Sequence, residues 1–141
     1  MLIQHEYELL DPAECMNLLG FSHVGRIALS IGALPAIYPV NYMIDGDSIV
    51  FCTCTGADLS NATDKAVLAF EAGHIDPTGR GGWSVLAVGV ASEIGDPEIR
   101  LRLAFAEHAP WIPSDSARLF RLPLELVSGT RFALRDDHRS A

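Results

Sequence analysis

Lysine is almost missing from this chain of 141 residues, in which Lys65 is the sole example. The 10 basic residues stand against 18 acidic ones, which gives a formal net charge of -8. Nonspecific binding to nucleic acid or to an anionic membrane needs a basic face, so this composition argues against both partners. A phosphate on a small ligand would have to be bound by arginine, by hydroxyl groups or by backbone N–H groups.

Long apolar runs and a cysteine framework are also missing. Glycine or proline interrupts each apolar run well short of the roughly 18 residues that a membrane helix needs. The start of the chain, residues 4–8, is polar and acidic, unlike a signal peptide. Cys15, Cys52 and Cys54 have neither the spacing of a zinc site nor the even number of a disulfide framework. We therefore expect a soluble cytoplasmic protein with free thiols.

Common catalytic and metal-binding motifs are absent as well. The five histidines show no HExxH or other ligand spacing, and no Gly-x-Ser-x-Gly elbow occurs, so we expect no metal site and no such nucleophile. The run Gly79-Arg80-Gly81-Gly82 lacks the lysine and the strand-to-helix setting of a phosphate-binding P-loop. It predicts an exposed loop, from which Arg80 could still reach a ligand.

The remaining pattern predicts one domain over residues 1–141, because no repeat or linker divides the chain and 49% of its residues are hydrophobic. Asp11 and Pro12 are typical of a helix start, and Gly20 ends that helix after residue 19. From Val24 onward the pattern favours strands. Expected strands are 24–31, 34–44, 48–54, 66–75, 83–94, 119–127 and 130–134, with helices at 56–64 and from 97 to about 107.

Two features of these strands bear on function. Pro35 and Pro39 remove ladder donors, so their strand must have gaps in its pairing, at an edge or beside a ligand or bulge. The strand at 83–94 is apolar on both faces over much of its length, which suits a barrel wall covered by a second subunit. A small barrel fills its interior with side chains, so a large ligand would lie outside it, between subunits.

The order of the pieces is distinctive: Pro39-Val40-Asn41-Tyr42, the turn Asp45-Gly46-Asp47, a strand ending in threonines, a short helix, and Gly82-Trp83-Ser84-Val85. Over residues 10–135 this order resembles the pyridoxamine-5'-phosphate-oxidase-like family of FMN-binding split barrels. The resemblance implies a mainly β protein, a six- to seven-stranded antiparallel split barrel with short peripheral helices. It also implies a homodimer with cofactor clefts at its interface.

The turn after the 48–54 strand is the candidate phosphate site. Thr53 and Thr55 share a strand face, and the helix that follows would present free N–H groups to an anion. Alternatively, Thr55 and Asp58 form a capping box that uses those N–H groups. Relatives commonly carry a basic residue near position 58, whereas an aspartate repels phosphate. Arg26 could compensate with its guanidinium, or could be an ordinary solvated arginine; Lys65 is a weaker candidate.

Five further residues are candidates for contact with the flavin ring. Val40, Asn41 and Tyr42 resemble the family segment that lies along the ring, and Asn41 could bond the pyrimidine edge. The alternative is an ordinary strand with Tyr42 in the core. For Trp83 and Ser84 the resemblance implies contact with the cofactor, whereas packing at the subunit interface is the alternative for Trp83.

Two functions remain open from the sequence. The first is an oxidoreductase that binds FMN or the deazaflavin F420 and transfers a hydride or electron pair to a small-molecule substrate. Its catalytic residues are unknown, because a flavin supplies the redox chemistry without a conspicuous acid–base pair. The second is a noncatalytic or cofactor-free dimeric ligand-binding protein of the same fold, in which Asp58 closes the phosphate site.

Overall fold

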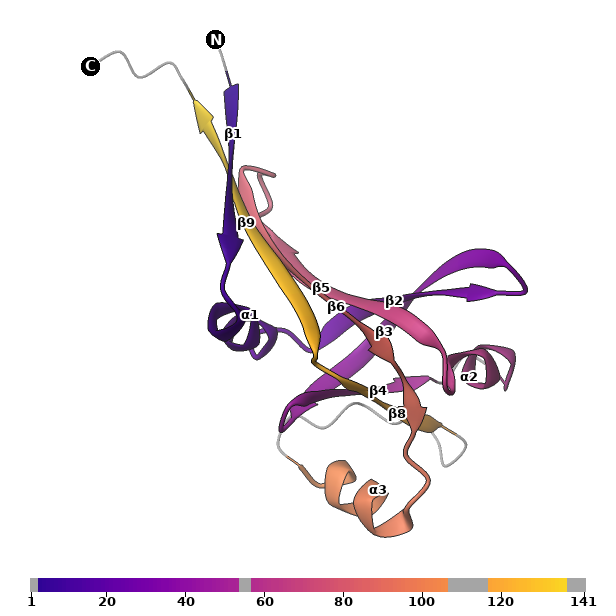
Figure 1. Cartoon of the computed structure of the whole chain (residues 1–141). Coiled ribbons are helices and arrows are strands. Elements are labelled where there is room, and N and C mark those ends of the chain that lie inside the picture. Colours follow the sequence, from indigo (N-terminus) through magenta and orange to yellow (C-terminus); the bar gives the residue numbers. More distant parts are fainter. Residues whose placement is uncertain (1–2, 54–56, 107–116, 137–141) are drawn as a thin grey trace.

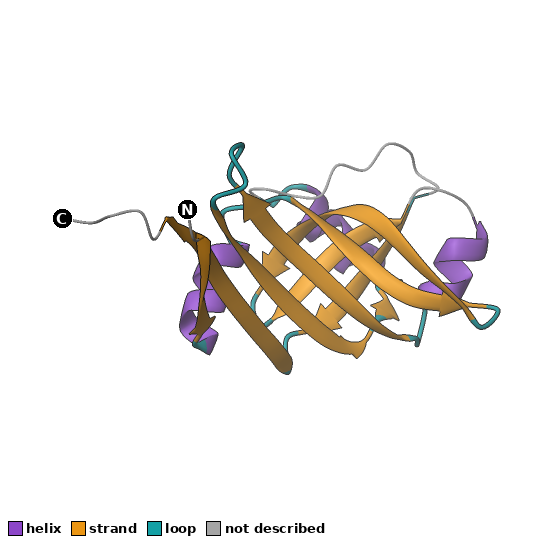
Figure 2. Cartoon of the chain, turned by 90° about the horizontal axis from the view of Figure 1, so that it is seen from above, coloured by secondary structure: helices purple, strands orange, loops and turns teal. Residues whose placement is uncertain are grey.

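The computed structural model describes residues 3–53, 57–106 and 117–136 and shows a curled sheet with short helices at its rim (Figures 1 and 2). The strands are β1 (Ile3–Leu10), β2 (Val24–Ile31), β3 (Leu34–Asp45), β4 (Ser48–Thr53), β5 (Val67–Ile75), β6 (Gly81–Val90), β7 (Ser92–Glu93), β8 (Arg118–Pro123) and β9 (Leu126–Asp136). The helices are α1 (Pro12–Leu19), α2 (Ala57–Thr63) and α3 (Pro97–Ala104). None of these helices is long and apolar enough to cross a membrane.

Every pairing in the sheet is antiparallel, in the order β1-β9-β6-β5-β2-β3-β4-β8-β7. The mainly β, antiparallel class expected from the sequence is confirmed. The expected number of strands, six to seven, was too low, because the described residues form nine. Figure 1 shows one reason: β1 and β9 form a ribbon that projects beyond the rest of the sheet.

The two added strands have physical explanations. β1 pairs with β9 alone, and Tyr7 and Leu9 are 68% and 85% exposed, so the strand lacks the buried alternation that marks a strand in a sequence. The expected strand at 83–94 divides at Ala91, whose N–H donates to the Ala66 carbonyl at 3.0 Å. The chain then changes neighbours, and β7 pairs with β8.

Helix α1 begins where the sequence predicts. The Asp11 carboxylate accepts the N–H of Glu14 at 2.8 Å, Pro12 occupies the first helical position, and Gly20 follows the last turn. Cys15 and Leu19 lie on the buried face of this helix. These residues belong to the same hydrophobic core as Leu59 of α2, a helix that Figure 1 shows on the other side of the molecule.

Strand β3 has the incomplete pairing that its prolines predict. Residues 34–41 pair with β2, and only residues 42–45 pair with β4. Pro35 and Pro39 both lie in the segment with a single described neighbour, where a missing N–H costs no ladder bond. The first part of β3 therefore presents a free backbone edge within the described residues.

Two hydrophobic clusters lie on opposite faces of β4. The inner core contains Tyr42, Phe51, Phe70 and Phe120, and the second cluster packs Val50 against Leu103 of α3. Because both of its faces are covered, β4 is buried along its whole length. The side chains of β4 are thus part of the hydrophobic clusters, and we look for a ligand site on other strands.

The other face of β3, β2, β5, β6 and β9, which we call the outer face, is apolar and exposed. Successive side chains of a strand point to opposite faces, so the residues of the outer face alternate with buried ones such as Ile27, Phe70 and Val85. The large apolar side chains of the outer face are 40–69% exposed: Val24, Ile37, Val67, Ile75, Leu86, Val90 and Leu126. So large an apolar surface is typical of an interface or a binding groove.

Candidate functional site

A polar group lies within the apolar outer face, on three adjacent strands. Arg26 of β2 is the register partner of Glu71 of β5, and Gly73 of β5 is the partner of Ser84 of β6. Side chains of paired residues point to the same face, so Arg26, Glu71 and Ser84 share the outer face. Hydrophobic neighbours such as Leu86 surround them on the same strands.

The contacts within this group join three residues through one carboxylate. Arg26 donates from Nε and Nη2 to Glu71 Oε1 at 3.1 and 2.6 Å. The Ser84 hydroxyl lies 3.0 Å from Glu71 Oε2. The Arg26 and Glu71 side chains are 52% and 30% exposed, so the ion pair is open to an approaching ligand. We call Arg26, Glu71 and Ser84 the polar triad.

The Asn41 side chain lies on the same outer face as the triad, whereas the residues before and after it in β3 point inward. Asn41 pairs with Val24 and is half-buried. Val40 and Tyr42 are 5% and 1% exposed and belong to the inner core. The free edge of β3 therefore carries one outward amide between two core side chains.

Tyr42 occupies the position that the alternative interpretation gave it. Its hydroxyl donates to the Leu19 carbonyl at 2.6 Å, and its ring meets Phe70 edge-on at 4.9 Å. Burial raises the pKa of Tyr42 to about 12. Its phenol is thus part of the core, although its backbone lies beside the free edge of β3.

Trp83 and Ser84 point to opposite faces of β6. Trp83 is half-buried and packs against the inner core, while Ser84 belongs to the polar triad. Of the ring-contact residues predicted from the sequence, Asn41 and Ser84 are thus brought to one face together with Arg26, the candidate for the phosphate. Val40, Tyr42 and Trp83 are directed to the core.

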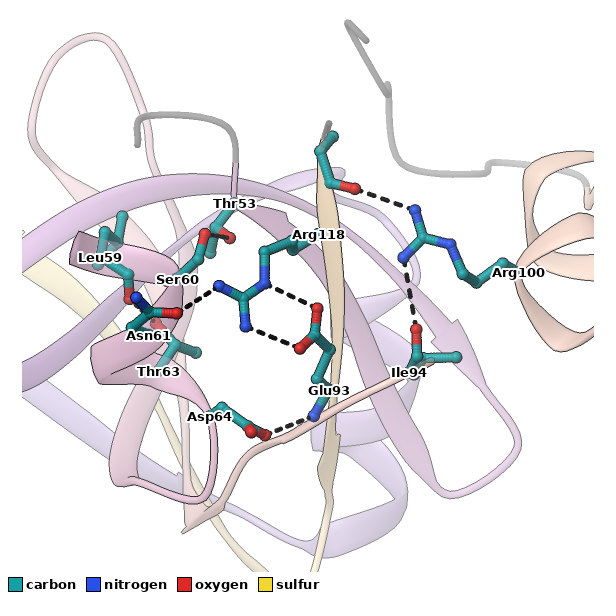
Figure 3. A network of polar contacts seen from close by, with 11 residues as sticks. Thr53, Leu59, Ser60, Asn61, Thr63, Asp64, Glu93, Ile94, Arg100 and Arg118 are labelled. Carbon is teal, nitrogen blue, oxygen red and sulfur yellow. Dashed lines mark hydrogen bonds and ion pairs between the residues drawn. The ribbon is translucent and has the colours of Figure 1, made fainter. Parts of the chain in front are cut away.

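The candidate phosphate site is only partly described. Thr53 is 3% exposed, and its hydroxyl shares a 2.7 Å hydrogen bond with that of Ser60 (Figure 3). Thr55 lies outside the described residues, so the choice between an anion site and a capping box stays open. Asp58 is exposed on α2. Arg26 and Thr53, two of the predicted phosphate donors, already have partners within the protein.

A basic residue that the sequence interpretation missed lies next to Thr53. Arg118 of β8 is its register partner, and Figure 3 shows the guanidinium between α2 and Glu93. Its Nε and Nη2 each donate to Glu93 at 2.7 Å, and its Nη1 donates to Asn61 Oδ1 at 2.7 Å. The hydrogen bonds from Arg118 to the Glu93 carboxylate lower the pKa of Glu93. Arg118 therefore ties α2 to the sheet.

Glu71 is the other residue that sequence reasoning missed. It is the single acidic residue in the expected strand at residues 66–75, a position where an apolar residue would be ordinary. The sequence shows this unusual residue, but it does not show the partners of Glu71. Arg26 is 45 residues away in the chain, and only the register of the folded strands brings it beside Glu71. Lys65, at the end of α2, and Arg80, in the β5–β6 turn, are exposed and lie outside the triad.

Comparison with known proteins identifies the family. A family model described as pyridoxamine 5'-phosphate oxidase matches residues 11–131. The chain belongs to this family. An uncharacterized protein of Mycobacterium tuberculosis is 35% identical over 127 residues, which cover 86% of this chain and 83% of that protein. The resemblance drawn from the order of motifs is thereby confirmed.

Solved structures of similar proteins show the same fold. The FAD binding protein from Mycobacterium smegmatis aligns with a TM-score of 0.73 at 27% identity, over 89% of this chain and 97% of its own. An FAD-binding protein of Mesorhizobium loti aligns with a TM-score of 0.74 at 20% identity, over 92% and 99% of the two chains. The second likeness concerns the fold alone. The split barrel expected from the sequence is confirmed.

Proposed function

We propose that this member of the pyridoxamine 5'-phosphate oxidase family binds a flavin on its outer face, works as a homodimer, and transfers a hydride or electron pair to a small-molecule substrate. A flavin ring needs an apolar surface for its faces and hydrogen-bonding groups for its pyrimidine edge. The outer face offers both, because the polar triad and Asn41 lie among exposed apolar side chains. This juxtaposition is the observation that carries the proposal.

The similar proteins support a flavin rather than another cofactor. The aligned proteins of Mycobacterium smegmatis and Mesorhizobium loti are FAD-binding proteins, whereas the motif order points to FMN or F420. FMN and FAD share the ring system that the outer face fits, so the proposal covers both. When bound, the flavin supplies the redox chemistry, and the protein holds and orients it.

The extent of the apolar outer face supports the proposed second subunit. Seven large apolar side chains on it are at least 40% exposed in the single chain. Burying exposed apolar surface lowers the free energy by roughly 25 cal/mol per Å². A second copy that covers this face would also shield the ring from water. Cys15 and Cys52 are both buried, and we propose that the protein works in the reducing cytoplasm.

Binding without catalysis, or without a cofactor, is the second candidate function, and the phosphate region favours it. Thr53 is bonded to Ser60, Arg26 is paired with Glu71, and Asp58 adds negative charge on α2. Within the described residues these groups offer no free cation to a phosphate. A protein that binds a ring without its phosphate would fit this arrangement.

Equilibrium titration distinguishes the two functions. Purified protein is titrated with FMN, FAD, F420 and the phosphate-free flavin lumiflavin, with ligand fluorescence as the readout. The proposal expects saturable binding of FMN or FAD with one site per chain. Absence of binding of all four compounds to folded protein would contradict flavin binding. Binding of lumiflavin with no gain from the phosphate would favour the second function.

A further inference from the structure

The hydrogen-bond polarity of Ser84 is fixed by Glu71. An ionised carboxylate has acceptors and no donor, and a serine hydroxyl has a single proton. Because Ser84 Oγ lies 3.0 Å from Glu71 Oε2, that proton is donated to Glu71. The remaining lone pairs of Ser84 can then only accept a hydrogen bond from a ligand.

Arg26 has the opposite polarity in the same triad. A guanidinium has donors and no acceptor, and two of its nitrogens, Nε and Nη2, bond to Glu71 Oε1. Nη1 takes no part in this pair. Glu71 therefore holds a donor on one side and an acceptor on the other, with one carboxylate oxygen for each.

The backbone at Gly73 leaves space for the Glu71 carboxylate to contact both Arg26 and Ser84. A Cβ atom at position 73 would lie 2.8 Å from Glu71 Oε2 and 2.7 Å from the Trp83 carbonyl oxygen. The carboxylate thus lies over a glycine, between the strand of Arg26 and that of Ser84. No larger residue at position 73 would permit this geometry unchanged.

We infer that Glu71 is a positioning residue that makes Ser84 an obligatory acceptor beside the donor Arg26, and that this pattern selects a ring edge in which an N–H adjoins a carbonyl. The imide edge of a flavin has that pattern. The inference rests on the proposed function and specifies which edge of the ring the triad recognises. It predicts selectivity against a flavin whose imide nitrogen carries a methyl group.

The test compares two phosphate-free ligands, lumiflavin and 3-methyllumiflavin, so that only recognition of the ring is measured. A site that hydrogen-bonds an N–H rejects an analogue without it, because a buried acceptor is left unpaired. For the unmodified protein we expect lumiflavin to bind at least about tenfold more tightly, a ratio that corresponds to roughly 1.4 kcal/mol.

Glu71→Gln reverses the polarity with little change in shape. The amide oxygen accepts from Arg26, and the amide NH₂ then donates to Ser84, whose proton is freed to point at the ligand. An outward hydroxyl proton opposes the ring N–H, so the binding ratio should fall to within about twofold of one. Glu98→Gln, an exposed acid on α3, removes the same charge and should keep the full ratio.

Each outcome decides between the possibilities. A ratio unchanged in Glu71→Gln would overturn the inference, and so would equal binding of both ligands by the unmodified protein. If Glu71→Gln does not fold, as judged by circular dichroism, Ser84→Ala takes its place and should also lose the ratio. If the unmodified protein binds none of lumiflavin, FMN, FAD and F420, the proposed function is rejected, and the inference with it.

Discussion

At the scale of single residues, the absence of a side chain at Gly73 allows the Glu71 carboxylate to take its place on the outer face. The neighbouring Trp83 carbonyl belongs to the backbone of a paired strand and cannot move away cheaply, and Glu71 occupies the remaining space. A glycine here is therefore a matter of close approach, since its backbone conformation is ordinary for a strand. The triad depends on this one position as much as on its own members.

We expect Gly73→Ala to destabilise the protein by about 1–3 kcal/mol, because the added methyl group meets a backbone oxygen at 2.7 Å and must displace Glu71. Urea unfolding followed by circular dichroism measures the change. Gly95→Ala is the matched control, because no atom lies within 4 Å of a Cβ atom there. Equal stability of the two variants would show that the strand yields at position 73.

At the scale of elements, the Arg118 contacts connect α2, β7 and β8. Each side chain of the Arg118–Glu93 pair is 29% exposed, and both bonds between them measure 2.7 Å. Glu93 also donates its backbone N–H to Asp64 at 2.9 Å. This connection positions the described part of the candidate phosphate site, Thr53 at the end of β4 and Asp58 on α2.

Arg118→Met should cost about 1–3 kcal/mol at neutral pH, because it leaves the Glu93 carboxylate partly buried and unpaired. The pKa of Glu93 is lowered in the folded state, so the pair stabilises the protein above the ordinary value of 4.5. This contribution is lost as the pH falls through the lowered pKa. The stability difference between variant and unmodified protein should therefore shrink below about pH 4.5.

Denaturant midpoints measured from pH 3 to pH 7 check this dependence. Arg131→Met serves as the control, since its contact with Glu8 is longer, at 3.4 Å, and more exposed, and should contribute little at any pH. A constant difference across the whole range for Arg118→Met would contradict the assigned role of Glu93.

Features made by neighbours in the chain could be predicted from the sequence, whereas contacts between distant residues could not. Asp11, Pro12 and Gly20 predicted α1 correctly because a helix cap is made by neighbours in the chain. The prolines of β3 predicted its incomplete pairing for the same reason. The triad could not be predicted, because the register that sets Arg26 opposite Glu71 is a property of the folded sheet.

At the scale of the whole molecule, the proposed dimer and the proposed flavin site both depend on the outer face. Its exposed apolar residues lie on five strands, and burying them requires a partner surface of similar size. A second copy of the chain brings such a surface. If both proposals hold, assembly and flavin binding use the same face and should be linked.

Leu86→Glu tests that link. Leu86 is 40% exposed near the polar triad, and a carboxylate buried there would be unpaired, so the dimer dissociation constant should rise at least about tenfold. Sedimentation equilibrium measures it. Leu101→Glu, which alters an apolar residue of α3 that is 61% exposed, should leave assembly unchanged. The same dissociation constant in both variants would mean that another surface joins the subunits.

The most direct test of flavin binding on the outer face is a crystal structure of the protein grown with FMN or FAD. The account predicts electron density for the ring against the outer face, with the imide edge at Arg26 and Ser84 and a second subunit covering it. Density for the ring elsewhere on the protein, or an outer face occupied by solvent at saturating flavin, would contradict the account.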